Sequence, residues 1–338
     1  MNFLAGEKVP LLLDALKQSE FKVLVPTENN REASCFSEWT GKETLLLREQ
    51  TFYGPKKALL PQKEKLFEFK KDGKRTSAEH LFSYQKKIVF GIRPCDLNAV
   101  LVNDRVFLHF GINDSFYEHN RKHVLFIALQ CTKAGENCFC TSLGTNKPKG
   151  FDLLLTPMEN GFFVETGSAE GKKILKQFPS FFSETKKKKP NYRIVCKNSI
   201  PKKDWHALLE KQFNNPVWKR TAERCLSCGS CTQVCPTCFC FSVEDSFNDF
   251  SLRDSARYRE LDSCFLLQFS RVAGGLIFRE ARDARLKQFV NHKYDYFPKN
   301  HGVIGCVGCG RCISACPVKI SISEILNAVA GKRKVKKQ

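Results

Sequence analysis

Two cysteine runs in the C-terminal half of the chain have a spacing that can hold metal. Each run reads Cys-x-x-Cys-x-x-Cys-x-x-x-Cys-Pro, and they occupy residues 225–236 and 306–317. In this pattern three thiolates bind one iron-sulfur cube, and the fourth cysteine binds the other cube. The spacing therefore predicts two 4Fe-4S clusters with crossed ligands: Cys225, Cys228, Cys231 and Cys316 for the first, and Cys306, Cys309, Cys312 and Cys235 for the second.

Zinc is the alternative interpretation of the two runs. Zinc takes four ligands, so it would leave the Cys-Pro at the end of each run unexplained. The glycines between the cysteines also fit a cluster, because glycine lets the backbone pass close to a ligand. We expect Gly229, Gly308 and Gly310 to bring backbone amides close to the sulfide ions.

A third group of cysteines lies upstream of the two runs. Cys95 and Cys131 follow apolar runs of strand length, and Cys138 and Cys140 form a Cys-x-Cys pair. Four thiols can hold one more cluster, although this spacing is not a standard ferredoxin pattern. We expect a third 4Fe-4S cluster at these four residues, with zinc or unligated thiols as the alternatives.

Five further cysteines fit none of these patterns. Cys238, Cys240 and Cys264 lie near the first run, and we expect them to pack as small apolar side chains around a cluster. A ligand exchange or a redox role is the alternative for these three thiols. Cys35 and Cys196 stand apart from every group.

Two regions of different character must position the cysteines. Short apolar runs at 21–25, 87–91 and 124–129 are rich in β-branched and aromatic residues, which predicts the strands of a mixed α/β module. Lysines at 186–189 indicate a surface connection. We therefore expect an α+β protein, in which residues 1–190 form an α/β module with a 4Fe-4S site and residues 201–330 form a mainly helical two-cluster ferredoxin module.

The expected helices of the second module lie within residues 204–213, 265–290 and 321–329. Residues 236–305 separate the two cysteine runs, and they are expected to be mostly helical. This connection is much longer than in a compact small ferredoxin, and it suggests the ferredoxin module of a multi-subunit oxidoreductase.

Composition excludes several classes of protein. The chain has 338 residues, of which 42% are hydrophobic, so it can bury a substantial core. Charged residues within 1–20 interrupt any apolar leader, and the 17 cysteines are mostly clustered, which favours a reducing cytoplasmic location over a secreted disulfide scaffold. No run approaches the roughly 18 apolar residues of a membrane-spanning helix.

The net charge of +20 raises the question of nucleic-acid binding. The lysine runs at 186–189 and 332–337, however, lie in an expected linker and tail, so we expect solvated charge and no nucleic-acid partner. The chain also lacks a glycine motif for a dinucleotide, and residues 167–172 are one residue short of a phosphate-binding loop. We expect no catalytic residue of its own, and therefore redox partners.

A combination of motifs points to a family. The three cysteine groups occur in order together with Pro216-Val-Trp218, Cys235-Pro-Thr-Cys238, Asp262-Ser-Cys264, Ala273-Gly-Gly275 and Phe278-Arg279. Over about residues 85–325 the chain resembles the iron-sulfur beta subunit of cytoplasmic NAD(P)-linked nickel-iron hydrogenases, or sulfhydrogenases. It is also similar to the iron-sulfur electron-transfer component of anaerobic sulfite reductase, especially over residues 136–146.

This resemblance implies an electron-relay subunit between a flavin subunit that handles NAD(P)H and a hydrogenase or sulfur-compound reductase. It implies nothing for residues 1–85. A stand-alone iron-sulfur flavoenzyme, with flavin or substrate in the N-terminal module, is the first alternative. An iron-sulfur protein that binds nucleic acid is the second, and its binding would weaken steeply with salt.

Overall fold

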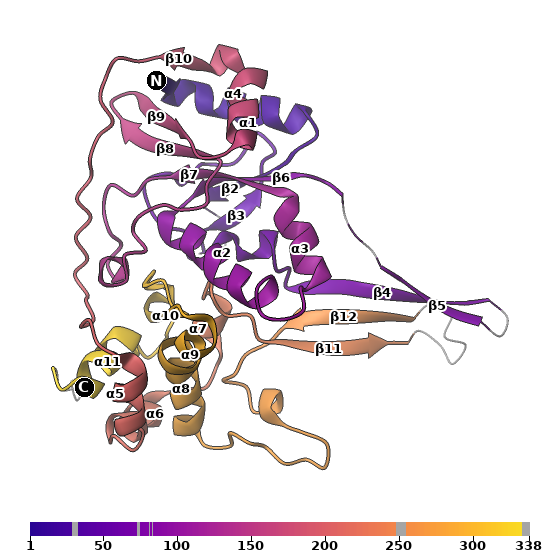
Figure 1. Ribbon diagram of the computed structural model, residues 1–338, viewed down its shortest axis with the longest axis vertical. Helices are drawn as coiled ribbons and strands as arrows, with labels where there is room; N and C mark the ends of the chain where they lie inside the picture. The colour runs from indigo at the N-terminus through magenta and orange to yellow at the C-terminus, as the bar shows by residue number, and fades with distance from the viewer. Residues whose placement is uncertain (29–32, 73–74, 81, 83, 248–254, 333–338) are drawn as a thin grey trace.

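The computed structural model describes residues 1–28, 33–72, 75–80, 82, 84–247 and 255–332 (Figure 1). Its larger sheet has eight strands and lies in the upper part of the view. In spatial order these are β10 (Phe182–Glu184), β1 (Asn2–Ala5), β9 (Gly161–Thr166), β8 (Leu153–Met158), β7 (Val124–Leu129), β6 (Lys87–Ile92), β2 (Lys22–Thr27) and β3 (Cys35–Glu38).

The centre of this sheet is parallel, since β2, β6, β7 and β8 pair in parallel. Parallel strands are usually covered on both faces, which explains their continuous apolar runs. The strands expected within 21–25, 87–91 and 124–129 are confirmed as β2, β6 and β7.

Helices cover both faces of the sheet, and alternate residues of each strand face different helices. In β7, Ile127 packs in the core with α1 (Val9–Gln18) and α4 (Ala169–Gln177). Its neighbour Phe126 packs in a second core with α2 (Pro94–Phe107) and α3 (Ser115–Lys122). The second face is the one that turns toward the cysteine-rich part of the molecule, because α2 carries Cys95.

A smaller sheet joins the two halves of the chain. It has the order β11 (Phe241–Ser246), β12 (Ser255–Leu261), β4 (Lys63–Asp72) and β5 (Arg75–His80). Strand β12 pairs antiparallel with β4, and the buried Arg259 on β12 forms ion pairs with Glu64 and Asp114. Residues on either side of the lysine run at 186–189 therefore share one sheet, which projects to the right in Figure 1.

Most of the remaining helices surround the two cysteine runs. They are α5 (Trp205–Lys211), α6 (Val217–Arg224), α7 (Ser230–Gln233), α8 (Arg282–Asn291), α9 (Phe297–His301), α10 (Arg311–Ser314) and α11 (Ile322–Val329), with a π-helical turn at His292–Tyr296. Short 3-10 turns lie at Gly6–Lys8, Pro55–Ala58, Cys140–Ser142, Pro179–Phe181 and Gln268–Ser270. The fully buried Trp218, Leu209, Val290 and Leu326 form the centre of their core.

Helices and strands both occur, as expected for an α+β protein, but the second region is less helical than expected. The helices expected within 204–213 and 321–329 are confirmed as α5 and α11. Residues 236–305 contain β11 and β12, and α8 begins only at Arg282. Gly274 and Gly275, both with φ of +85°, form a turn that a helix cannot accommodate. Within the described residues, no helix is both long and apolar enough to span a membrane.

Candidate metal centres

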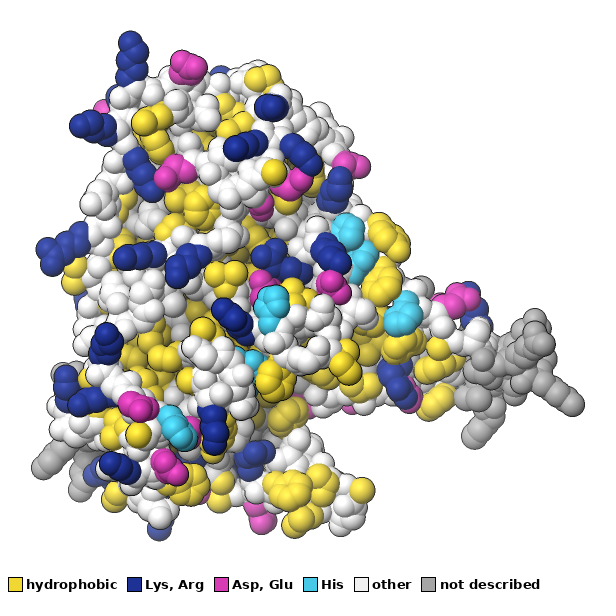
Figure 2. Space-filling model, viewed as in Figure 1, with side chains coloured by type: hydrophobic (Ala, Val, Ile, Leu, Met, Phe, Trp, Pro, Cys, Tyr) yellow, Lys and Arg dark blue, Asp and Glu magenta, His cyan; other side chains and the backbone are white. Residues whose placement is uncertain are grey.

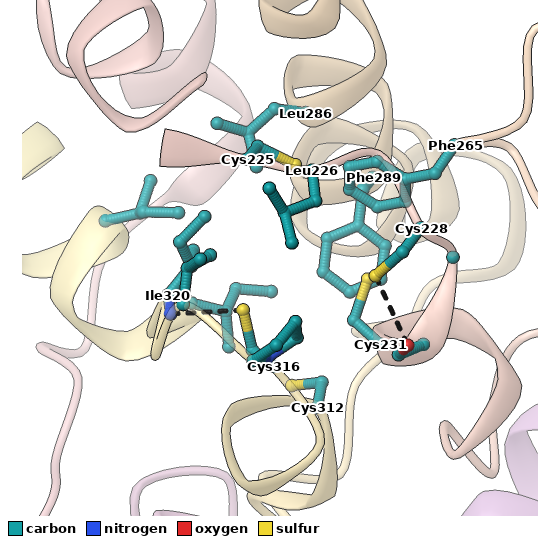
Figure 3. Close-up of a pocket in the computed structure, with 16 residues that line it drawn as sticks. Cys225, Leu226, Cys228, Cys231, Phe265, Leu286, Phe289, Cys312, Cys316 and Ile320 are labelled. Atoms are coloured by element: carbon teal, nitrogen blue, oxygen red, sulfur yellow. Dashed lines mark hydrogen bonds between the residues drawn. The ribbon is translucent and has the colours of Figure 1, made fainter. Parts of the chain in front are cut away.

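The first predicted ligand set surrounds one cavity (Figure 3). Cys225, Cys228, Cys231 and Cys316 all line it, so the cysteine that the crossed assignment takes from the second run lies with the three of the first. The rest of the wall is largely apolar and includes Phe265, Leu286, Phe289, Ile320, Ile322 and Ile325. Four thiols around an apolar cavity fit the donor set of a cubane.

Local backbone geometry directs these thiols inward. Helix α6 ends at Cys225, and Gly229 adopts a left-handed φ of +76° immediately before α7. The Ser227 amide donates to Cys225 Sγ at 3.4 Å, and the Ile320 amide donates to Cys316 Sγ at 3.3 Å. Amide donors of this kind stabilise a thiolate or a cluster sulfur.

The second ligand set surrounds a neighbouring cavity, which Cys235, Cys306, Cys309 and Cys312 line. The two runs have closely similar backbones: Gly310 precedes α10 with a φ of +75°, and the Gly308 amide donates to Cys306 Sγ at 3.4 Å. Cys312 lines the first cavity as well. The two predicted clusters are therefore adjacent.

A buried lysine lies beside the second ligand set. Lys293, in the π-helical turn, donates to Cys235 Sγ at 3.4 Å, to Thr237 Oγ1 at 2.9 Å and to the Gly305 carbonyl at 3.2 Å. Burial alone would lower the pKa of Lys293, but the thiols of Cys235, Cys238 and Cys306 raise it well above its usual value. A buried cation at this position offsets the negative charge of thiolates, which would otherwise be costly to bury.

The third predicted group lies at one edge of the large sheet. Cys95 is in the first turn of α2 after β6, and Cys131 follows β7, so the two ends of these parallel strands bring them together. Gln50 connects this part to the Cys-x-Cys pair: its amide nitrogen donates to Cys95 Sγ at 3.4 Å, and Cys138 Sγ donates to its amide oxygen at 3.9 Å. Cys138 and Cys140 are both buried.

A fifth thiol belongs to this third group. Cys196 Sγ lies 3.7 Å from Cys140 Sγ, although the sequence placed Cys196 apart from every group. The segment that follows Cys196 is held against the same loop, because Asn198 donates to the Glu136 carbonyl and the Ile200 amide donates to Ser142 Oγ. No spacing pattern signals this contact, since it depends on how the connection between the two regions packs.

The third group is in direct contact with the second. The Phe139 amide donates to the Gly308 carbonyl at 2.8 Å, and Cys138 Sγ donates to the Cys309 carbonyl at 3.4 Å. A Cβ atom at Gly310 would lie 2.4 Å from the backbone of Asn137. Gly308 and Gly310 thus permit a close approach to the loop of the third group, a role that the sequence did not indicate.

The three thiols that follow the first run lie close to these cavities. Cys238 and Cys264 pack against the core of the helical part, as expected. The Cys238 thiol is hydrogen-bonded to Cys235, and the Cys240 thiol to Cys264. Cys35 lies on β3 and belongs to none of the three groups.

Within the part of the chain that the structure describes, no three Cys, His, Asp or Glu side chains converge on a point that could hold a single metal ion. A cubane makes no such demand, because its four thiolates bind different irons. The three thiol groups lie in the order third, second, first, with Cys309 and Cys312 at the two junctions. Such a series can carry electrons from one end to the other.

Comparisons with known proteins agree with this arrangement. A family model described as a 4Fe-4S dicluster domain matches residues 224–320, which include both cysteine runs. The chain is 32% identical over 292 residues to sulfhydrogenase 2 subunit beta of Pyrococcus furiosus, and the alignment covers 83% of this chain and 84% of that protein. The chain belongs to the iron-sulfur hydrogenase beta subunit family. The resemblance noted from its motifs is confirmed.

As a hydrogenase beta subunit, the protein is an iron-sulfur electron-transfer subunit, and its dicluster domain accounts for two 4Fe-4S clusters. It is also 24% identical over 186 residues to F420-dependent formate dehydrogenase subunit beta of Methanocaldococcus jannaschii. That alignment covers 54% of this chain and 40% of the relative. No solved structure matches the chain.

Proposed function

We propose that this hydrogenase beta subunit relays electrons between a flavin subunit that handles NAD(P)H and the catalytic subunit of a soluble cytoplasmic hydrogenase. Three 4Fe-4S clusters carry the electrons. The observation that supports this proposal most is the series of three adjacent thiol groups, in which Cys312 lines two cavities and the Cys138 thiol contacts the Cys309 carbonyl.

The first cluster binds to Cys225, Cys228, Cys231 and Cys316, and the second to Cys306, Cys309, Cys312 and Cys235. This crossed assignment is supported by the two cavities, each of which contains one complete set. The third cluster binds to Cys95, Cys131, Cys138 and Cys140, with Cys196 as a fifth thiol that can take the position of Cys140. Support for this set comes from the Gln50 contacts and the distance of 3.7 Å between Cys140 and Cys196.

The proposed partners follow from what the chain contains and what its relatives are. Both relatives are named as beta subunits, one of a sulfhydrogenase and one of a formate dehydrogenase. The flavin partner rests on the family resemblance and on the lack of a dinucleotide motif in the sequence. The name of the first relative favours a hydrogenase complex over the sulfite reductase complex that the motifs also suggested.

Analysis of iron and acid-labile sulfide tests the proposed cofactors. Protein purified without oxygen, or reconstituted with iron and sulfide, should contain about twelve of each per chain, because three cubanes require four each. About eight of each would remove the third cluster from the account. Fewer than about eight would contradict the dicluster assignment itself.

A further inference from the structure

A small hairpin projects from the molecule between the first thiol group and α8. The Val272 amide donates to the Leu276 carbonyl at 2.9 Å, the Phe278 amide donates to the Ser270 carbonyl at 3.1 Å, and Arg271 forms a β-bridge with Ile277. Gly274 and Gly275 form the turn at the tip. We call residues 270–278 the Gly-Gly hairpin; backbone hydrogen bonds define its shape. Figure 1 shows it extending away from α8 at the bottom of the view.

The Gly-Gly hairpin directs large apolar side chains into solvent. The exposed fraction is 67% for Phe278, 61% for Leu276 and 42% for Val272. None of these three side chains belongs to an apolar core formed by the described residues. Figure 2 shows a group of hydrophobic side chains on the projection at the lower edge of the molecule. A contiguous exposed apolar patch usually marks an interaction site.

Both ends of the projecting segment attach to the first thiol group. At one end Phe265 lines the first cavity, and the next residue, Leu266, lies beside Gly229. At the other end Arg282 Nη1 donates to the Cys225 carbonyl at 2.9 Å, and Arg285 Nη2 donates to Ser227 Oγ at 3.1 Å. The hairpin is therefore held in a defined position relative to the first cavity.

The first thiol group reaches the surface at this place. All 17 cysteines lie within the described residues, and Cys228 is the only exposed one. Leu226, two residues away, is 60% exposed and extends the apolar surface onto the cysteine run itself. An electron can leave or enter the series of clusters here with the least protein in its path.

The surface around the hairpin is basic. Residues 266–285 contain four arginines and two carboxylates, and Arg271 and Arg282 are exposed. A matching surface would combine an apolar depression with acidic side chains at its rim, because complementary charges steer association and set orientation.

We propose that the Gly-Gly hairpin and Leu226 form the docking surface for a redox subunit of the complex, one with an apolar socket, an acidic rim and an electron-carrying group that faces Cys228. The inference rests on the proposed relay function. A redox partner is favoured because it must approach the exposed thiol, whereas a membrane or a nucleic acid gains nothing from proximity to a cluster. The hairpin supplies binding contacts without contributing a ligand to the cluster.

A double variant, Leu276→Ser with Phe278→Ser, removes the apolar contacts. Its backbone hydrogen bonds are unchanged, so the hairpin and the first cluster should persist. Large apolar side chains at the centre of an interface are typical hot spots, so the dissociation constant should rise about tenfold or more. Ile112→Ser is the matched control, because Ile112 is 93% exposed on a different loop.

The test compares the native complex with the isolated chain. The complex is purified anaerobically from the source organism through a tag on this chain, and amide hydrogen exchange is measured for both samples. Peptides that cover 270–278 should exchange more slowly in the complex, and the protecting subunit should contain flavin, iron or nickel. The double variant should lose this redox partner during purification while it keeps its iron, and Ile112→Ser should retain both.

Two results would overturn the docking surface alone: equal exchange of the hairpin in the complex and the isolated chain, or protection by a second copy of this chain, a lipid vesicle or nucleic acid. Retention of the redox subunit by the double variant would also overturn it. If the unmodified chain forms no complex at all, the proposed relay function fails, and the docking surface fails with it.

Discussion

Arg311 and Asp96 form a buried bidentate ion pair between the second cysteine run and the helix that carries Cys95. Arg311 Nη2 donates to Asp96 Oδ2 at 2.9 Å, and Arg311 Nε donates to the Thr51 carbonyl at 2.8 Å. The side chains are 2% and 1% exposed. Because Cys95 precedes Asp96 and Cys312 follows Arg311, this pair holds the third thiol group against the second.

Replacing one member of this pair should be strongly destabilising. Asp96→Asn leaves the Arg311 guanidinium buried without an anion, which typically costs about 3–5 kcal/mol. Urea unfolding under anaerobic conditions measures the loss. Glu170→Gln is the control, because it breaks an exposed ion pair with Lys173 and should leave the unfolding midpoint almost unchanged. Equal small effects of both substitutions would contradict the role of the buried pair.

Gly310 should tolerate alanine much less well than Gly302. Both have left-handed φ values, +75° and +71°, so each alanine variant carries roughly 1–2 kcal/mol of backbone strain. A Cβ atom at Gly302 meets nothing within 4 Å, whereas one at Gly310 would lie 2.4 Å from the backbone of Asn137. The difference in unfolding free energy between the two variants measures the clash and should reach about 1–3 kcal/mol. No difference would show that the contact between the second and third groups is loose.

The sequence predicts the chemistry of the two runs because their ligands are set by local spacing. Cys225 and Cys306 begin runs whose geometry depends on a few neighbouring glycines, so the pattern is readable without the fold. Cys196 could not be assigned in this way, because 56 residues separate it from Cys140 and only the packing of the connecting segment brings them together. The same holds for Arg311 and Asp96, which lie 215 residues apart.

Secondary structure shows the same division. The apolar runs of β6 and β7 are long enough to predict from sequence, since buried parallel strands carry continuous apolar residues. Strand β12 is short and contains three charged residues, Arg257, Arg259 and Glu260, so its pairing with β4 is not apparent from its own pattern. Its register depends on partners such as Glu64, which the fold brings from the other region.

Serine substitutions distinguish the roles of the thiols in the third group. Cys138→Ser should lower the iron content by about four per chain, because a cube that lacks a thiolate is usually labile. Cys140→Ser should lower it less, since Cys196 can replace the missing ligand, and the double variant of Cys140 and Cys196 should lose the whole cluster. Cys35→Ser, the control, should change nothing. If Cys140→Ser loses as much iron as the double variant, Cys196 is not a substitute ligand.

Lys293 should raise the reduction potential of the second cluster. Lys293→Met removes a buried positive charge that lies 3.4 Å from Cys235 Sγ, so addition of an electron becomes less favourable. Coulomb's law with an effective dielectric constant near 20 gives a decrease on the order of 100 mV. A redox titration followed by electron paramagnetic resonance measures it, with the exposed Lys299→Met as the control. A shift of equal size in the control variant would sink this assignment.

The central claim is that the chain relays electrons and catalyses no reaction by itself, and an anaerobic activity assay on the purified chain tests it most directly. The isolated protein should accept electrons from dithionite into its clusters, yet it should neither oxidise NAD(P)H nor reduce protons, sulfite or polysulfide. It should become competent only when the flavin and catalytic subunits are added. Rapid NAD(P)H oxidation by the single chain, with flavin bound to its N-terminal region, would contradict the relay and establish a stand-alone flavoenzyme.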